Sequence, residues 1–250
     1  MVKKLLRDTV ALWLNTASLE TAIMAARDMR ACTRTLVITP NFFLANGPPG
    51  IRCFYELGVS DVMLNTRLCG DPAEIRQCVT AAAELGVKAL TVSGLAGTES
   101  IACAIQAASD SRKTTLKVNR PKVLVTALPS SLTDSELTSQ LRLRVRRPGH
   151  IEQICRQALE AGADGVVVEY GDVKYVRRVS RQLPYMVFAQ RRVRNYTETD
   201  RADEKSKAGI TEIVRAGASH VIFDSEFIRR TDVEWAADMV NKELEAATRS

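Results

Sequence analysis

The stretch VMLNTRLCGDP, residues Val62–Pro72, carries polar side chains where a predicted strand gives way to a helix. Asn65 supplies an amide, and Arg67, two residues later, supplies a guanidinium. Side chains two apart on a strand share a face, so both are expected to project from the same strand end. A guanidinium binds anions but does not readily give up its proton. The pair therefore indicates anion binding rather than acid–base catalysis.

A second interpretation makes Arg67 a structural residue. A buried arginine needs a partner, because an isolated buried charge is costly. Glu169 and Asp224 are predicted to end two other strands near the same edge. On this interpretation one of them pairs with Arg67 and fills the space at the strand ends.

Two groups of arginines define a candidate interaction surface. They are Arg142, Arg144, Arg146 and Arg147 in one segment and Arg191 and Arg194 in another. Together with the formal net charge of +6, they favour contact with RNA or with a protein partner. The alternative is a pair of solvated loops, the commoner role of a charge run. Only Tyr196 lies close by in sequence, which gives little support for stacking on single-stranded bases.

The sequence predicts neither a metal site nor a cofactor. Its six cysteines include no Cys-x-x-Cys pair, and His150 and His220 lie far apart in the chain. Most cysteines fall in apolar periodic stretches, which predicts buried, reduced thiols in a reducing intracellular compartment, either the cytoplasm or the mitochondrial matrix. No apolar run approaches the roughly 18 residues that a membrane span needs, so no membrane insertion is expected.

A short recurring signal organises the chain. Four times a helical pattern ends in a glycine followed by a short apolar run, at Gly58, Gly86, Gly162 and Gly217. Glycine adopts the left-handed conformation after a helix without a steric penalty. A short run that is apolar throughout is typical of a strand buried on both faces. The signal therefore predicts repeated helix-to-strand units.

These units predict an α/β protein. The expected strands are Val10–Asn15, Thr35–Thr39, Asp61–Asn65, Ala89–Ser93, Val123–Leu128, Gly165–Glu169, Tyr185–Ala189 and His220–Phe223. The clearest helices are Ser18–Met29, Pro72–Leu85 and Asp232–Ala247. Eight alternations favour a single (β/α)8 TIM barrel over residues 1–250, with a doubly wound open sheet as the rival. Basic insertions are expected near residues 109–122, 128–149 and 190–205.

The order of these motifs resembles the orotidine 5′-phosphate decarboxylase family from Val10 to Leu244. The segments that carry the resemblance are FFLANGP at 42–48, TVSGLAG at 91–97, VTALPSS at 125–131 and GADGVVVE at 162–169. The resemblance implies a barrel of the ribulose-phosphate-binding type. It also implies a homodimer or heterodimer formed through the C-terminal face of the barrel.

The resemblance assigns catalysis to residues that this chain lacks. In the family, a lysine protonates the carbanion left by loss of CO2, and carboxylates position that lysine and stress the substrate. The corresponding positions here are degenerate and read Asn15, Val37, Asn65, Arg67 and Gly70. Asp71 stands one residue after the position of the family's last carboxylate, and Ser93 stands where the family has histidine. No catalytic residue is therefore predicted.

The ligand pocket that the resemblance implies is only partly kept. Its remaining positions are Ser93, Ser130, Arg192, Asp224 and Ser225. Gln190 replaces a glycine of the family's phosphate-binding turn, and a Cβ there hinders close approach of the backbone to phosphate. Asp224 and Glu226 stand where the family has a glycine and an arginine, so they would repel a phosphate dianion.

The sequence leaves three functions open. The leading expectation is a pseudoenzyme that serves as a structural or scaffold subunit of a larger assembly, such as a ribonucleoprotein or a mitochondrial complex. The first alternative is a divergent orotidine 5′-phosphate decarboxylase or lyase of pyrimidine biosynthesis, which would bind a pyrimidine nucleotide such as UMP. The second is an inactive regulatory partner of an active paralogue.

Overall fold

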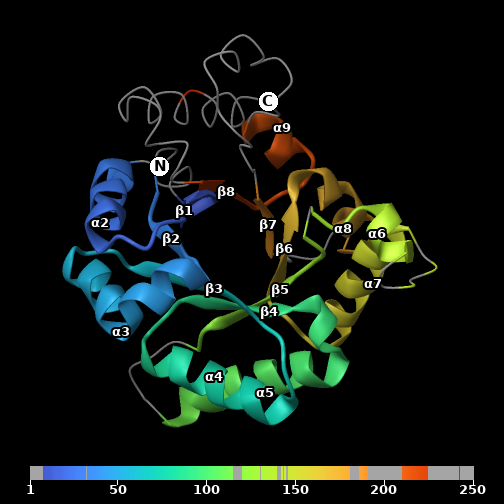
Figure 1. Cartoon of the computed structure of the whole chain (residues 1–250), viewed down its shortest axis with the longest axis horizontal. Coiled ribbons are helices and arrows are strands. Elements are labelled where there is room, and N and C mark those ends of the chain that lie inside the picture. The colour runs from blue at the N-terminus through green and yellow to red at the C-terminus, as the bar shows by residue number, and fades with distance from the viewer. Residues whose placement is uncertain are drawn as a thin grey trace. The chain divides into compact units, whose positions relative to one another are not determined.

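The computed structural model describes residues 8–31, 33–114, 120–129, 131–139, 142, 144, 146–180, 186–190, 210–224 and 242. Within these residues the strands follow one another in sequence order around a closed barrel (Figure 1). The register is parallel between β1 and β2, β1 and β8, β4 and β5, and β5 and β6. The strands are β1 (Val10–Leu14), β2 (Thr35–Ile38), β3 (Asp61–Leu68), β4 (Ala89–Ser93), β5 (Lys122–Thr126), β6 (Gly165–Glu169), β7 (Met186–Gln190) and β8 (His220–Asp224). The predicted TIM barrel is confirmed, and the open sheet is excluded.

Helices connect the strands. They are α2 (Leu19–Asp28), α3 (Pro40–Glu56), α4 (Pro72–Glu84), α5 (Thr98–Thr114), α6 (Asp134–Ser139), α7 (Arg147–Glu160), α8 (Val173–Ser180) and α9 (Ile210–Arg215), with short 3-10 turns η1 (Met29–Ala31), η2 (Gly94–Ala96) and η3 (Tyr170–Asp172). The predicted helix Asp232–Ala247 lies outside the described residues. In the described part of the chain no helix is both long and apolar enough to cross a bilayer.

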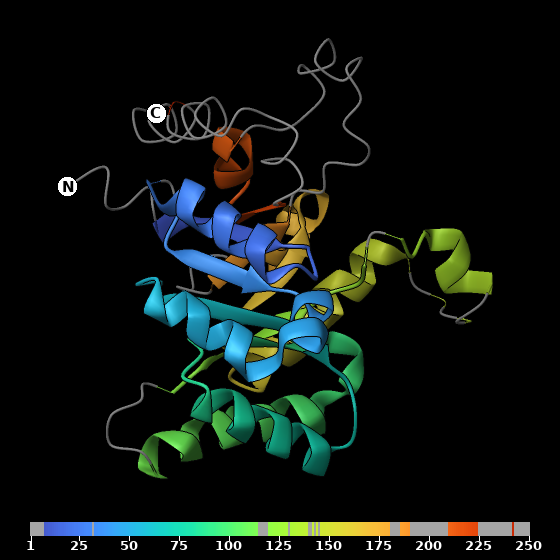
Figure 2. The same cartoon turned by 60° about the vertical axis from the view of Figure 1, so that its left-hand side comes forward.

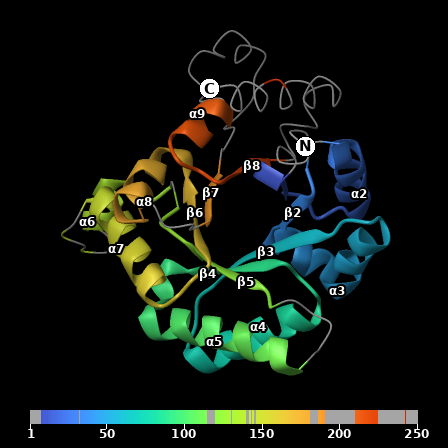
Figure 3. The same cartoon turned by 180° about the vertical axis from the view of Figure 1, so that it is seen from behind.

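The chain divides into two compact units. Residues 1–63 and 189–250 form the first, in which α2 and α3 pack against each other (Figure 1). Residues 64–188 form the second, in which α4 packs on α5 and α7 on α8, as the reverse view also shows (Figure 3). Within this second unit, α6 stands away from α4 and α5 (Figure 2).

Each unit has its own apolar core. In the first unit Phe42 and Phe54 are fully buried, and their ring centroids lie 5.4 Å apart. In the second unit Leu90, Ile101 and Leu124 are almost completely buried. Burying side chains of this size stabilises the fold by roughly 1.5–3 kcal/mol each. The barrel strands are apolar because helices cover them on one side and the barrel interior on the other.

The glycine signal is confirmed in all four places. Gly58, Gly86, Gly162 and Gly217 have φ values of +79°, +76°, +84° and +108°. These are conformations that residues with a Cβ adopt only with strain, so glycine ends each helix and turns the chain into the next strand.

Several predicted boundaries were wrong. Strand β3 runs to Leu68, three residues beyond the predicted end at Asn65, so Arg67 lies inside the strand. The expected insertion near 109–122 is helical up to Thr114, because α5 continues through its polar residues. The expected insertion near 128–149 contains α6 and the first turn of α7. Polar composition alone did not distinguish an exposed helix end from a loop.

The prediction of buried thiols was wrong for most of the described cysteines. Cys155 is buried, but Cys69 and Cys78 are exposed, and Cys53 and Cys103 are intermediate. Burial raises the pKa of the Cys155 thiol to about 12, with Asp172 and Glu152 adding to the shift. Cys155 is therefore a neutral packing residue of α7, whereas Cys69 and Cys78 lie on solvated faces that periodicity had not separated from the core.

Candidate active site

The ends of β3 and β4 share a buried hydrogen-bond network. The side-chain oxygen of Asn65 accepts a hydrogen bond from the hydroxyl of Thr91 at 3.0 Å. The same Thr91 hydroxyl accepts the backbone N–H of Arg67 at 2.9 Å. Asn65 is 1% exposed and Thr91 is fully buried. The network holds the two positions that the resemblance gives to a carboxylate and a lysine.

Arg67 adopts an unusual backbone conformation. Its φ is +48°, in the left-handed region that a non-glycine residue enters at a cost of roughly 1–2 kcal/mol. Its N–H bond to Thr91 helps to hold it there. Strained residues of this kind cluster at functional sites, where the surrounding structure compensates for the strain. The guanidinium of Arg67 is thus carried by a fixed rather than a mobile strand end.

Two other residues at these strand ends serve as helix caps. Asp71, the acid that lies one residue late for the family pattern, accepts hydrogen bonds from the backbone N–H groups of Ala73 and Glu74 at 2.9 and 3.0 Å. Ser93, at the family's histidine position, accepts the N–H of Leu95 at 3.2 Å. Both side chains satisfy backbone donors at the start of a helix, which accounts for their presence without a catalytic role.

The sequence analysis missed two polar residues that the structure places beside this network. Thr91 was hidden in an apolar strand, and Thr126, 6% exposed, pairs in register with Ser93 at the end of β5. The hydroxyl of Thr126 lies 3.4 Å from the carbonyl of Val92. A signal for Thr91 existed in the sequence, since it lies two residues before Ser93 and side chains two apart on a strand share a face. Sequence spacing gave no such signal for Thr126, which lies opposite Ser93 on the neighbouring strand.

Arg147 differs from the other arginines of its run. Its side chain is 18% exposed and forms an ion pair of 2.6 Å with Asp172, which is 7% exposed. Its Nη1 donates to the carbonyls of Pro129 and Leu132 at 2.9 and 3.1 Å. Its Nη2 donates to the carbonyl of Leu128 at 2.9 Å. The grouping of Arg147 with a solvated basic surface is therefore corrected, because its guanidinium fastens the segment after β5 to η3.

The rest of the predicted basic surface is described only in part. Arg142, Arg144 and Arg146 are exposed. Arg191 and Arg194 lie outside the described residues. Contact of these arginines with RNA or a protein partner stays a prediction.

The remaining predicted site residues lie in several environments. In the first unit Asn15 is exposed just after β1, and Val37 is fully buried in β2. In the second unit Glu169 ends β6 and is half-buried. Asp224 ends β8, and nothing is described of its side chain. Ser130, Arg192 and Ser225 lie outside the described residues. The predicted pairing of Arg67 with Glu169 or Asp224 stays a prediction.

No cluster of three or more His, Cys, Asp or Glu side chains suited to a metal ion occurs among the described residues. The chemistry available at the described ends of β3 and β4 is therefore that of a guanidinium, an amide and hydroxyl groups. Such a set binds anions and carbonyl oxygens and orients a planar ring by hydrogen bonds.

Comparisons with known proteins identify the chain's relatives. No protein-family profile matches it. The orotidine 5′-phosphate decarboxylase of Moorella thermoacetica is 28% identical over 208 residues, which cover 82% of this chain and 79% of the relative. The orotidine 5′-phosphate decarboxylase of Gloeothece citriformis is 23% identical over 240 residues, which cover 96% of this chain and 99% of the relative. The crystal structure of orotidine 5′-phosphate decarboxylase from Lactobacillus acidophilus superposes on this chain with a TM-score of 0.76 at 18% sequence identity. The superposition covers 94% of this chain and 98% of that structure. The resemblance to this family extends over most of the chain, as the sequence predicted.

The expectation that the chain is not an enzyme is contradicted by these relatives. Five curated proteins match, and all five are named orotidine 5′-phosphate decarboxylase. The absence of these acid–base residues excludes one mechanism and does not by itself exclude activity. The relatives also give no support for a mitochondrial location.

Proposed function

We propose that this protein is a divergent lyase of the orotidine 5′-phosphate decarboxylase type, acting on a pyrimidine nucleoside 5′-monophosphate at the C-terminal ends of its strands. One observation carries the proposal. Asn65 and Arg67, which stand at the carboxylate and lysine positions of the resemblance, are held at one strand end by Thr91. A strand end locked in this way is suited to present a fixed cation to a bound ring.

Arg67 replaces the lysine as the proton donor in this proposal. Decarboxylation breaks the bond between C6 of the pyrimidine and its carboxylate carbon, CO2 leaves, and the electron pair stays on C6. The guanidinium of Arg67 transfers a proton to C6, giving UMP, and then regains a proton from water. The pKa of a guanidinium lies far above neutral pH, so it is a poor acid toward ordinary bases. A carbanion on a ring carbon is far more basic than guanidine, so the transfer is favourable despite that pKa.

The missing carboxylates lower the rate that we expect. Asn65 cannot repel the substrate carboxylate as an acid would. Arg67 instead attracts that carboxylate before the reaction, and an interaction that favours the ground state does not accelerate the chemical step. We therefore propose a slow enzyme.

A measurement of nucleotide binding tests the proposed site independently of catalytic turnover. Isothermal titration calorimetry should show that 6-hydroxyuridine 5′-monophosphate, with an anionic oxygen on C6, binds at least about tenfold more tightly than UMP. This preference is expected because the positive charge of Arg67 attracts the anionic oxygen on C6. Arg67→Ala should remove that preference while changing UMP affinity little.

The matched control is Arg76→Ala, because Arg76 is exposed on α4 and makes an ion pair of 3.6 Å with Asp110. It should leave both affinities unchanged. Failure of wild-type protein to bind either nucleotide would contradict the proposed site. The dimer that the resemblance implies is kept as a proposal, and a mass of twice the 27.5 kDa chain would support it.

A further inference from the structure

A pocket lies in the first unit, among residues 26–60. It has a volume of about 470 Å³ and is formed by the last turn of α2, η1, the start of β2 and the turn between α3 and β3. It is therefore at the N-terminal ends of β2 and β3. Small-molecule sites typically occupy roughly 300–1,000 Å³, so this pocket is large enough for one.

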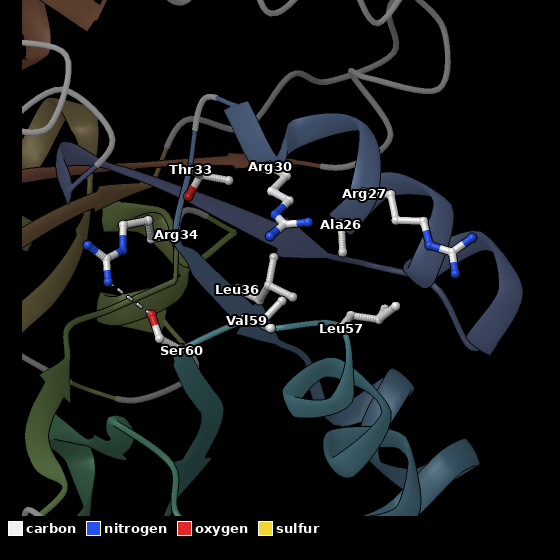
Figure 4. A pocket seen from close by; sticks show the side chains of 10 residues that line it. Ala26, Arg27, Arg30, Thr33, Arg34, Leu36, Leu57, Val59 and Ser60 are labelled. Carbon is white, nitrogen blue, oxygen red and sulfur yellow. Dashed lines mark hydrogen bonds between the residues drawn. The ribbon is translucent and has the colours of Figure 1, made fainter.

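Three arginines surround this pocket (Figure 4). Arg30 extends over its centre, with Arg27 and Arg34 on either side. The Nη2 of Arg34 donates to the hydroxyl of Ser60 at 3.4 Å. All three arginines are exposed: Arg27 lies in α2, Arg30 in η1 and Arg34 just before β2. Guanidinium groups match phosphate by paired, charge-assisted hydrogen bonds, so this arrangement favours a phosphate-bearing ligand.

The floor of the pocket is apolar. Leu36, Leu57, Val59 and Ala26 lie beneath the arginines (Figure 4). Leu36 is 3% exposed and Ala26 is 7% exposed, so both are fixed by packing in the core. A phosphate alone would leave this surface unused. A ligand with a planar or aliphatic body attached to the phosphate would cover it and gain from its burial.

Negative charges also lie near this pocket. The C-terminal ends of α2 and α3 each contribute about half a negative charge. Asp8 lies 4.0 Å from Arg34, and the two side chains are 55% and 41% exposed. An exposed pair at that distance stabilises the fold by at most about 1 kcal/mol, so an anion can compete for Arg34. The C-terminal end of α2 accounts for Arg27, which lies in its last turn.

We propose that this pocket binds a small organic phosphate, with the phosphoryl group held by Arg27, Arg30 and Arg34 and an apolar body resting on Leu36, Leu57 and Val59. None of the residues that line this pocket is assigned to the proposed nucleotide site. The phosphate site does not depend on the lyase proposal and would hold even if the chain had no decarboxylase activity.

Phenyl phosphate is the probe that tests both parts of the pocket. In low-salt calorimetry it should bind at least about tenfold more tightly than inorganic phosphate, because only the former uses the apolar floor. Saturating UMP should not displace it. Displacement by UMP, or equal affinity for the two phosphates, would overturn the proposal.

Substitutions at the pocket test whether phenyl phosphate binds there. Arg27→Gln with Arg30→Gln should weaken phenyl phosphate binding at least about tenfold, and the paired lysine variants should weaken it less, since lysine keeps the charge but loses the planar fork. Asp8→Asn should tighten binding by removing the acid that competes for Arg34. The control pair Arg52→Gln and Arg156→Gln removes the same charge from exposed positions outside the pocket. Equal weakening in the control would show nonspecific charge attraction and refute the site.

Discussion

Replacing Arg147 by glutamine should lower the free energy of unfolding by roughly 3–5 kcal/mol, the range found when one partner of a buried ion pair is removed. Asp172, only 7% exposed, would lose its 2.6 Å contact and remain charged in the interior. The carbonyls of Leu128, Pro129 and Leu132 would lose their shared donor as well. Urea unfolding followed by circular dichroism measures the change.

The control for this experiment is Arg178→Gln. Arg178 forms a 3.4 Å pair with Glu152, but its side chain is 65% exposed. Solvent screens such a pair, and its loss should cost no more than about 1 kcal/mol. A double variant with Asp172→Asn should be less destabilised than the sum of the two single variants, because each removes the same contact. An Arg147→Gln cost equal to that of the control would contradict the described network.

Restoring the acid–lysine–acid pattern of the resemblance should raise decarboxylation of orotidine 5′-phosphate by roughly 100-fold or more, the contribution typical of a positioned acid or base. The variant combines Asn65→Asp, Arg67→Lys and Gly70→Asp. It supplies a cation that releases a proton more readily and carboxylates that destabilise the substrate carboxylate. Initial rates at saturating substrate measure the gain.

The local structure accommodates these changes. The hydroxyl of Thr91 already donates to the side-chain oxygen at position 65, as it can to a carboxylate. A Cβ at Gly70 would come within 2.5 Å of the Glu74 carboxylate, which is the free end of a flexible side chain and can rotate away. Arg67→Lys alone should give a smaller gain. A folded triple variant with wild-type stability and no gain in rate would show that the strand ends do not present these groups to substrate.

Periodicity and glycine position were sufficient to predict the barrel. Gly58 and Gly86 each end a helix and begin a strand, a local effect of backbone conformation that needs no knowledge of distant contacts. Val37 and Leu90 lie in short apolar runs that only strands with two buried faces require. These signals are repeated along the chain, so errors of a few residues at individual boundaries did not change the predicted fold.

The details of the site depended on contacts that sequence spacing does not reveal. Arg147 stands in a run of arginines, yet its partner Asp172 is 25 residues away and its role follows from burial. The left-handed conformation of Arg67 is accompanied by the hydrogen bond from its N–H to Thr91, and no residue type in the sequence predicts it. Sequence spacing places Asp71 one residue beyond a motif position, whereas its hydrogen bonds show that it caps a helix. Each of these features depends on contacts in the folded structure that the local sequence does not specify.

The most direct test of the lyase proposal is the release of CO2 from orotidine 5′-phosphate labelled in its carboxylate, measured with the purified protein at saturating substrate. The proposal predicts release above the buffer blank, lost in Arg67→Ala and retained in Arg76→Ala. Release equal to the blank, or release that persists unchanged in Arg67→Ala, would contradict the assignment of this strand end as the catalytic site.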